Sequence, residues 1–468
     1  MAVGLLLVYL PLLPVVGVLA GTAVLLLIFI DPLLGLALAL LAGPLGAAES
    51  LYVQLGPLDS GQILLLLTTA SWLAKGLAAR RVQIPRSRLT LPLLLYILLT
   101  AVTLLGARSL PVGLRELLKW VEIWLVMVMV ADLGNGRTVW VLAAVLLAGV
   151  SQGLLGIWQF GLRGDGPEHF LVLGRFYRAF GTFNQPNPFG GFMNLSALLA
   201  LGVLLGLAAW GWQERHRLFG DGGQGVRPYL AATVLVGIVA IITTLGLLFS
   251  WSRGAWLGFA AGTAVLLFFG PTQRKWGVLL GLAVLVLSVS AWQAGLVPAS
   301  VADRITGFSQ DLTLGDVRGV DINDTNFAVL ERLAHWQAAI GMAQDHLWLG
   351  VGFGNYEPAY ADYDLINWPA PLGHAHNYYL NLLAETGVIG LAAYLLLWTA
   401  VFWLTWQQLN RTSWPSRGIA LGLLAVWTAM AVHHLVDKLY VNNMYVHLGV
   451  LFGVLVLLEN GRSNKQKL

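Results

Sequence analysis

The chain has 468 residues, of which 57% are hydrophobic and only 11% are charged, and its mean hydropathy is +0.74. Soluble domains carry about 25% charged residues, so this apolar excess is too large for one soluble core and must largely face lipid. The small net charge of +4 gives no reason to expect a nucleic-acid partner, and the absence of cysteine excludes disulfides, iron–sulfur clusters and thiolate chemistry. The composition therefore predicts an all-α integral membrane protein.

Apolar stretches long enough to cross a bilayer, which takes about 20 residues, recur along most of the chain. They lie near residues 4–30, 33–48, 62–79, 91–107, 114–133, 138–160, 187–211, 228–249, 254–270, 276–296, 378–406, 418–437 and 443–459. Pro11 and Pro14 interrupt the first stretch and the second is short, so these two can form one span with a re-entrant piece or three short spans. We expect about 12 transmembrane helices, within a range of about 12–14, in a single membrane domain covering residues 1–468.

The first basic loop fixes the expected orientation in the membrane. Residues 75–88 include five basic side chains, so the positive-inside rule places this loop in the cytoplasm. Alternation of the spans then brings the other basic loops and the C-terminal tail to the same side. The segments expected on the outer side are 161–187, 250–253, 297–377 and 437–443.

The outer segment 297–377 precedes the third-last span, and residues 331–344 within it have a helical pattern. A structureless loop of about 80 residues is uncommon in a compact protein. We therefore expect a large, partly helical extracytoplasmic loop that covers or builds a site, with a plain spacer as the alternative.

Motifs for nucleotide and metal chemistry are weak or missing. The chain has no GxxxxGK[ST] phosphate loop and no HExxH zinc motif. The glycines of residues 350–354 follow no clear strand, so we interpret them as a turn. Asp362 and Asp364 form a pair of the kind that can hold a divalent cation beside a diphosphate, although such pairs also arise by chance in acidic loops. We expect neither a bound metal nor a cofactor.

Three arginines lie on the expected outer side. Arg178 precedes a span, and Arg253 occupies a very short turn between two spans. Arg332 follows Glu331 in the outer helical segment. A guanidinium group presents a planar fork of donors that matches phosphate oxygens, so three such groups around one outer cavity favour a phosphate-binding site. The alternative is that each side chain extends to the lipid head groups.

Histidines form a second group of candidates. His374 and His376 stand where the outer segment re-enters the membrane, and His376 lies at or near the N-terminus of a long helix. The partial positive charge of a helix N-terminus disfavours imidazolium, and neutral imidazole is the form that a general base requires. The alternative is a structural histidine that caps the helix. His433 and His434 lie inside a later span, where a hydrogen bond to Asp437 can explain one of them.

In their order, these motifs resemble the O-antigen ligase and polymerase superfamily. The matching stretches span about 175–390 and are RAFGTFNQPN at 178–187, SWSRG at 250–254, Glu331 and Arg332 with Trp336, LGVGFGN at 349–355, HAHN at 374–377 and ETG at 385–387. Each motif alone is weak, whereas their order, together with the large outer loop before the third-last span, is quite specific.

The resemblance implies a metal-independent glycosyltransferase of the GT-C type in the bacterial cytoplasmic (inner) membrane. Such an enzyme takes a glycan from an undecaprenyl or other polyprenyl diphosphate at the outer face and transfers it to an acceptor hydroxyl during lipopolysaccharide or other envelope polysaccharide synthesis. By resemblance, the diphosphate-binding residues are Arg178, Arg253 and Arg332. The expected catalytic residue is His376, with His374 as the second candidate. The expected supporting residues are Asn187, Glu331, Asn377 and Tyr378.

The acceptor stays open at the level of sequence. A ligase passes the glycan to a glycolipid, an O-antigen or exopolysaccharide polymerase to a growing glycan, and a protein O-oligosaccharyltransferase to a protein hydroxyl. A secondary transporter is the alternative of another class, but we find no convincing internal repeat, and the ionisable groups collect at one face. A non-catalytic lipid-binding partner would need the arginines but not His376.

Overall fold

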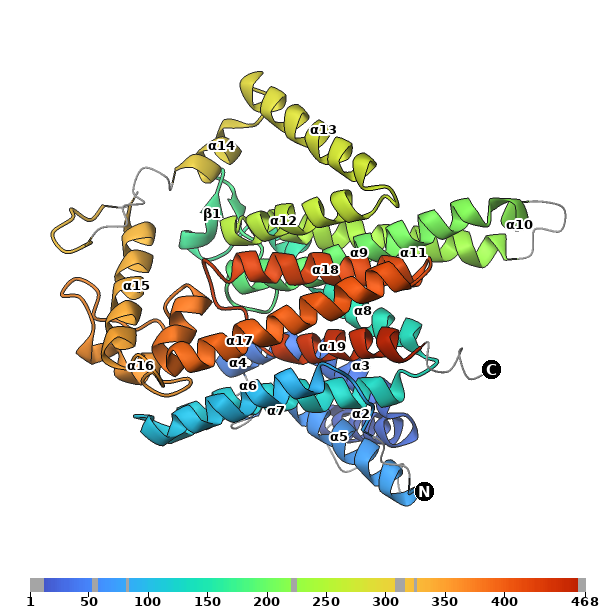
Figure 1. Cartoon of the computed structure of the whole chain (residues 1–468), viewed down its shortest axis with the longest axis horizontal. Coiled ribbons are helices and arrows are strands. Elements are labelled where there is room, and N and C mark those ends of the chain that lie inside the picture. The colour runs from blue at the N-terminus through green and yellow to red at the C-terminus, as the bar shows by residue number, and fades with distance from the viewer. Residues whose placement is uncertain are drawn as a thin grey trace.

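The computed structural model describes residues 12–52, 58–80, 84–219, 225–307, 316–323 and 326–461. In these ranges nearly all regular structure is helical, and the only two strands, β1 (Leu171–Val172) and β2 (Phe176–Tyr177), pair antiparallel. Most helices run along the long axis of the molecule (Figure 1). The predicted all-α membrane architecture is confirmed.

The described helices of the N-terminal half run up to residue 219. They are α2 (Leu12–Ile30), α3 (Pro32–Ala42), η1 (Gly43–Leu45), α4 (Gly46–Tyr52), α5 (Ser60–Ala78), α6 (Thr90–Thr103), η2 (Leu104–Gly106), α7 (Leu110–Leu133), α8 (Thr138–Gly161), η3 (Glu168–Phe170), α9 (Pro186–Gln213) and α10 (Arg215–Phe219).

The C-terminal half contains the remaining spans and the helices of the outer segment. They are α11 (Val226–Phe249), α12 (Arg253–Phe269), α13 (Arg274–Gln293), α14 (Ala299–Thr306), α15 (Phe327–Asp345), α16 (Tyr356–Ala359), η4 (Tyr360–Asp362), α17 (Tyr378–Arg411), α18 (Ser416–His433) and α19 (Met444–Asn460).

In the described part of the chain, seven helices are long and apolar enough to cross a membrane, and four shorter apolar helices accompany them. The predicted spans 62–79 and 114–133 coincide with α5 and α7, which carry more polar residues. Every predicted span therefore falls on a helix, although the first eleven residues lie outside the described ranges. The helix predicted at 331–344 is also present, as α15.

Two pairs of glycines let α9 and α18 cross at very short range. A Cβ atom added to Gly202 would lie 2.3 Å from the Cα of Gly422, and one added to Gly418 would lie 2.4 Å from the Cα of Gly206. Both helices therefore carry glycine at a spacing of four, the pattern that allows close backbone contact in membranes, where packing rather than water exclusion holds helices together. This crossing fixes the first turns of α18 against α9.

The basic loops gather at one end of the bundle. Ser87 donates a hydrogen bond to Glu459 (2.9 Å), and Arg88 donates one to Gln407 (3.1 Å), so the loop after α5 meets the ends of α17 and α19. The outer helices α15 and α16 lie at the opposite end (Figure 1). This separation agrees with the predicted alternation, while the side that faces the cytoplasm stays a prediction.

Candidate functional site

The short turn between α11 and α12 is the centre of the basic part of the site. The chain leaves α11 at Phe249, and the Ser252 side chain accepts a hydrogen bond from the Ala255 N–H at the start of α12. Arg253 is the first residue of α12, so its side chain lies at the end of that helix next to the short turn. The turn thus presents Arg253 on a capped helix rather than on a loose loop.

Two further arginines hold neighbouring carbonyl groups of this turn. Arg178 Nε donates to the Ser250 carbonyl (2.9 Å), and its terminal nitrogen donates to Asn187 Oδ1 (3.2 Å). Arg304, on α14, donates to the Trp251 carbonyl from two nitrogens, at 3.0 and 3.3 Å. Three segments far apart in sequence therefore meet at one turn.

Buried glutamines of α8 explain why the segment before α9 adopts its conformation. Gln159 Oε1 accepts from the N–H groups of Phe180 and Gly181 (3.0 and 2.7 Å), and its Nε2 donates to the Gly181 carbonyl (2.8 Å). Gln152 similarly accepts from the N–H of Thr182 (3.0 Å). A buried backbone needs such partners, and they fix the loop that starts with Arg178.

The arginines are close enough to repel one another. Burial, followed by the charges of Arg304, Arg332 and Arg253, lowers the pKa of Arg178 to about 9. Burial and Arg332 likewise lower the pKa of Arg304. Partly buried like charges are unfavourable without a counterion, so an anion would stabilise this cluster. The three predicted arginines do come together, and Arg304 joins them as a fourth.

His376, in the loop before α17, lies near Arg332 of this cluster. Its φ angle is +52°, an unusual conformation for a residue other than glycine, which indicates a position determined by its surroundings. Both ring nitrogens are buried without a hydrogen-bond partner. Burial, together with His374 and Arg332, lowers its pKa to about 3, so the ring is neutral. This agrees with the predicted neutral form, although burial is the largest cause.

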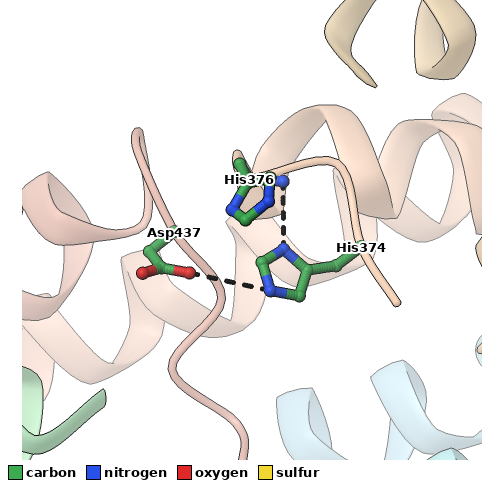
Figure 2. A group of neighbouring side chains, drawn as sticks. All are labelled: His374, His376 and Asp437. Atoms are coloured by element: carbon green, nitrogen blue, oxygen red, sulfur yellow. Dashed lines mark hydrogen bonds and ion pairs between the residues drawn. The ribbon is translucent and has the colours of Figure 1, made fainter. Parts of the chain in front are cut away.

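One ring nitrogen of His374 is hydrogen-bonded to the loop backbone. The backbone N–H of His376 donates to His374 Nδ1 (3.0 Å), so the proton of the neutral ring belongs on Nε2. Figure 2 shows that Nε2 faces the Asp437 carboxylate, and the distance of 3.7 Å between them is longer than a hydrogen bond. The Nδ1 contact ties the His374 ring to the backbone of His376, and the two ring centroids lie 4.4 Å apart.

A third histidine completes the group on the side of α15. The ring of His335 lies 5.7 Å from that of His376, and His335 Nδ1 is 3.0 Å from the Tyr356 hydroxyl. Since this hydroxyl donates to the His335 carbonyl (3.1 Å), the ring nitrogen is its donor. His335 follows Arg332 by three residues, so both lie on the same face of α15.

The glycine motifs hold the outer segment against the start of α17. Gly350, Gly352 and Gly354 all have positive φ angles, as the predicted turn requires. Gly387, at φ +61°, interrupts α17 and approaches the Trp348 backbone so closely that a Cβ would lie 2.3 Å from it. The Val388 N–H donates to the Leu347 carbonyl across this contact (2.9 Å).

The expected supporting residues have different positions. Asn377 caps α17 by accepting from the N–H groups of Tyr379 and Leu380, and Asn187 contacts Arg178. Tyr378 is fully buried among aromatic rings, including Tyr394 at 5.3 Å, so it packs in the core at the start of α17. Glu331 is half-buried beside Arg332, and burial raises its pKa.

Two sequence interpretations need correction or refinement. Asp362 forms an ion pair with Arg108, which gives it a structural partner in place of a cation. The predicted hydrogen bond from His433 or His434 to Asp437 is not found among the described residues, because the Asp437 carboxylate faces His374 and accepts from the Lys438 N–H (2.8 Å).

One set of residues in the described part of the chain has the spacing of metal ligands. The ligand atoms of His374, His376 and Asp437 all lie within 4.8 Å of one another. Three observations disfavour a cation here: His374 Nδ1 accepts a backbone hydrogen bond, Asp437 accepts from the Lys438 N–H, and arginines lie nearby. The absence of a metal stays a prediction.

The sequence interpretation missed Arg304 and His335. Arg304 lies in the outer segment, where the scarcity of arginine could have marked it, but it belongs to no motif. His335 lies one helical turn after Arg332, and this spacing is the only feature of the sequence that could have indicated it.

The fold and the site together define an all-α membrane protein with a basic, histidine-containing site at one end of its helical bundle. Residues 238–395 match the O-antigen ligase family, which confirms the predicted resemblance to the O-antigen ligase superfamily over this part of the chain. The matched range includes Arg253, Arg332 and both loop histidines, whereas Arg178 lies before it. The family indicates a glycan-transferring enzyme. The chain matches no curated protein.

Proposed function

We propose that the protein transfers a glycan from a polyprenyl diphosphate carrier to an acceptor hydroxyl at the outer face of the bacterial cytoplasmic membrane. The observation that carries this proposal is a buried, neutral His376 close to Arg332, which belongs to a cluster of four arginines that repel one another. Proton acceptance and diphosphate binding are the two tasks that such a transfer requires.

In the proposed reaction the acceptor oxygen attacks the anomeric carbon of the donor sugar. A new glycosidic bond forms as the bond from that carbon to the diphosphate oxygen breaks, and the acceptor proton passes to a ring nitrogen of His376. The polyprenyl diphosphate leaves with the bonding electrons. Arg178, Arg253, Arg304 and Arg332 then stabilise its developing negative charge.

The structural state of His376 supports its assignment as the base over His374. A general base needs a free nitrogen lone pair, and His376 has two buried nitrogens without partners. His374 instead accepts from the backbone at Nδ1 and faces Asp437 from Nε2. We therefore assign His374 and Asp437 to positioning His376.

The test is a transfer assay with purified protein, a polyprenyl diphosphate-linked glycan and alternative acceptors. His376→Ala is expected to reduce transfer about 10²–10⁴-fold, the usual effect of removing a general base, without loss of donor binding. His346→Ala, an exposed histidine at the end of α15, is the matched control. An active His376→Ala enzyme would assign the base to another residue.

Further measurements distinguish this function from the alternative functions. A chelator is expected to leave the rate unchanged, and loss of activity restored by a divalent ion would instead make a metal part of the mechanism. A glycolipid, a glycan or a protein acceptor distinguishes a ligase, a polymerase and a protein O-oligosaccharyltransferase. Donor movement across a vesicle membrane without any new glycosidic bond would support a transporter.

A further inference from the structure

The outer segment contains a run of exposed apolar side chains just after α15, named here the apolar run. Its residues Leu347, Trp348 and Leu349 are 47%, 67% and 43% exposed, and the exposed residues before them, 344–346, are polar. Tryptophan is enriched at the boundary between membrane and water. Three consecutive exposed apolar side chains are unfavourable in water, so the apolar run indicates a contact with an apolar partner.

A backbone hydrogen bond attaches the apolar run to a defined level of α17. The Val388 N–H donates to the Leu347 carbonyl (2.9 Å). Near the other end of α17, Gln407 accepts from Arg88 of the first basic loop, which marks the opposite side of the membrane. Val388 precedes Gln407 by 19 residues, or about 28 Å of helix. Since the hydrocarbon core of a bilayer is about 30 Å thick, the apolar run lies near its far edge.

The end of α6 gives the same level independently. This helix starts beside the basic loop at Thr90, and together with η2 it extends to Gly106, a length of about 27 Å. Leu105, in η2, is 90% exposed. The outer segment also contacts this point, because the Phe353 N–H donates to Thr103 Oγ1 (3.1 Å). Exposed apolar side chains therefore mark one level on two helices, about one hydrocarbon thickness from the basic loops.

We infer that Leu347, Trp348 and Leu349 insert into the boundary of the lipid bilayer at this level and anchor the end of α15 there. Lipid is the partner because it surrounds the bundle up to the same level, as exposed leucines such as Leu98 on α6 and Leu396 on α17 indicate. The inference rests on the membrane-spanning fold and does not depend on the proposed function.

Such an anchor would determine the height of one part of the site. The helix α15 lies across the end of the bundle, whereas the spans run along the long axis of the molecule (Figure 1). It carries Arg332 and His335, and its last residue, Asp345, precedes the apolar run by two positions. With the apolar run at the edge of the hydrocarbon core, α15 is held at the level of the lipid head groups, which lie just outside that core.

Single cysteines that carry an environment-sensitive fluorophore test this contact, since the chain has no cysteine of its own. The test positions are Trp348→Cys and Leu105→Cys. Leu98→Cys on α6, 61% exposed, marks a level about 10 Å deeper, and Val320→Cys, in the charged stretch of the outer segment, marks water. Each labelled protein is reconstituted into phosphatidylcholine vesicles whose lipids carry a nitroxide quencher either near the head group or near the chain end.

Fluorescence at positions 348 and 105 is expected to be lost most strongly to the nitroxide near the head group, and fluorescence at position 98 to the nitroxide near the chain end. Aqueous iodide should quench position 320, and neither lipid should. Iodide quenching at position 348 equal to that at position 320 would show that the apolar run lies in water and would overturn the inference. A fluorophore at position 348 that neither iodide nor lipid quenches would also overturn it, because the apolar run would then contact protein. Leu349→Cys provides the same measurement where Trp348→Cys does not fold.

Discussion

The buried ring of His376 makes the pH dependence of transfer a direct probe of its role. The base acts in its neutral form, so activity falls when the pH drops through the pKa of His376 in the folded protein. Because burial lowers this pKa to about 3, the rate of the free enzyme, measured as kcat/KM, should still be near its plateau at pH about 6.5, where a free histidine is half protonated.

The control for this experiment is unfolding at low pH. The unfolded chain binds protons to His376 below about pH 6.5 and the folded chain does not, so stability is retained above that pH and is lost as the pH falls toward the folded pKa. Thermal unfolding of wild-type protein at each pH identifies this loss. A kcat/KM that halves near pH 6.5 in still-folded protein would contradict a buried base at position 376.

Arg304 differs from the other arginines because it belongs to no recognised motif. Arg304→Ala is expected to lower kcat/KM about ten- to a hundredfold, the usual effect of losing one charge-assisted contact to phosphate. Arg304→Lys should restore little, since an ammonium group cannot reproduce the fork that donates to the Trp251 carbonyl and still faces the cluster. Arg318→Ala, at an exposed arginine of the same outer segment, is the control. Full activity of Arg304→Ala would remove Arg304 from the diphosphate site.

Single residues were predictable where their chemistry is conspicuous against an apolar chain. Arg253 stood out because short outer loops contain few arginines, and the structure brings it together with Arg178 and Arg332. The engagement of His374 was not predictable, because its partner Asp437 is 63 residues further along the chain. Long-range pairs of this kind depend on how α17 and α18 pack, which local sequence does not encode.

At the scale of elements, the crossing of α9 and α18 depends on glycine. Gly202→Leu forces side-chain atoms against the Gly422 backbone and is expected to lower the free energy of unfolding by at least about 1–3 kcal/mol. Gly237→Leu on α11 is the control, since a Cβ there meets no atom within 4 Å. Thermal unfolding in detergent measures both. Equal stability of the two variants would show that the crossing tolerates a side chain.

Helix positions were predictable because a span must satisfy its backbone internally and present apolar side chains to lipid. The interruption of α17 at Gly387 was not, because its cause is the approach of the distant Trp348 backbone. The sequence likewise did not indicate which side chains compensate the charged residues of α7. Glu116 is compensated by Lys438, whose Nζ lies 3.0 Å away and which comes from a different part of the chain.

For the whole molecule, the separation of basic loops from the site determines how substrates would reach it. The basic loops gather at one end of the bundle, whereas α15, which carries Arg332 and His335, lies at the opposite end (Figure 1). In the proposed orientation, a lipid-linked donor enters from within the membrane and an acceptor enters from outside. Both routes require the end with α15 to be extracytoplasmic.

Single introduced cysteines test this orientation, because the chain has no cysteine of its own. Val320→Cys and Ile366→Cys lie in the predicted outer segment, and Ala79→Cys and Asn410→Cys lie at the opposite end, all at exposed positions. A membrane-impermeant thiol reagent applied to intact spheroplasts is expected to label only the first pair, because only that pair lies on the outer side of the membrane. All four should react after permeabilisation, which controls for accessibility. Labelling of positions 79 and 410 in intact spheroplasts, without 320 and 366, would invert the topology. The site would then face the cytoplasm, and transfer at the outer face would be impossible.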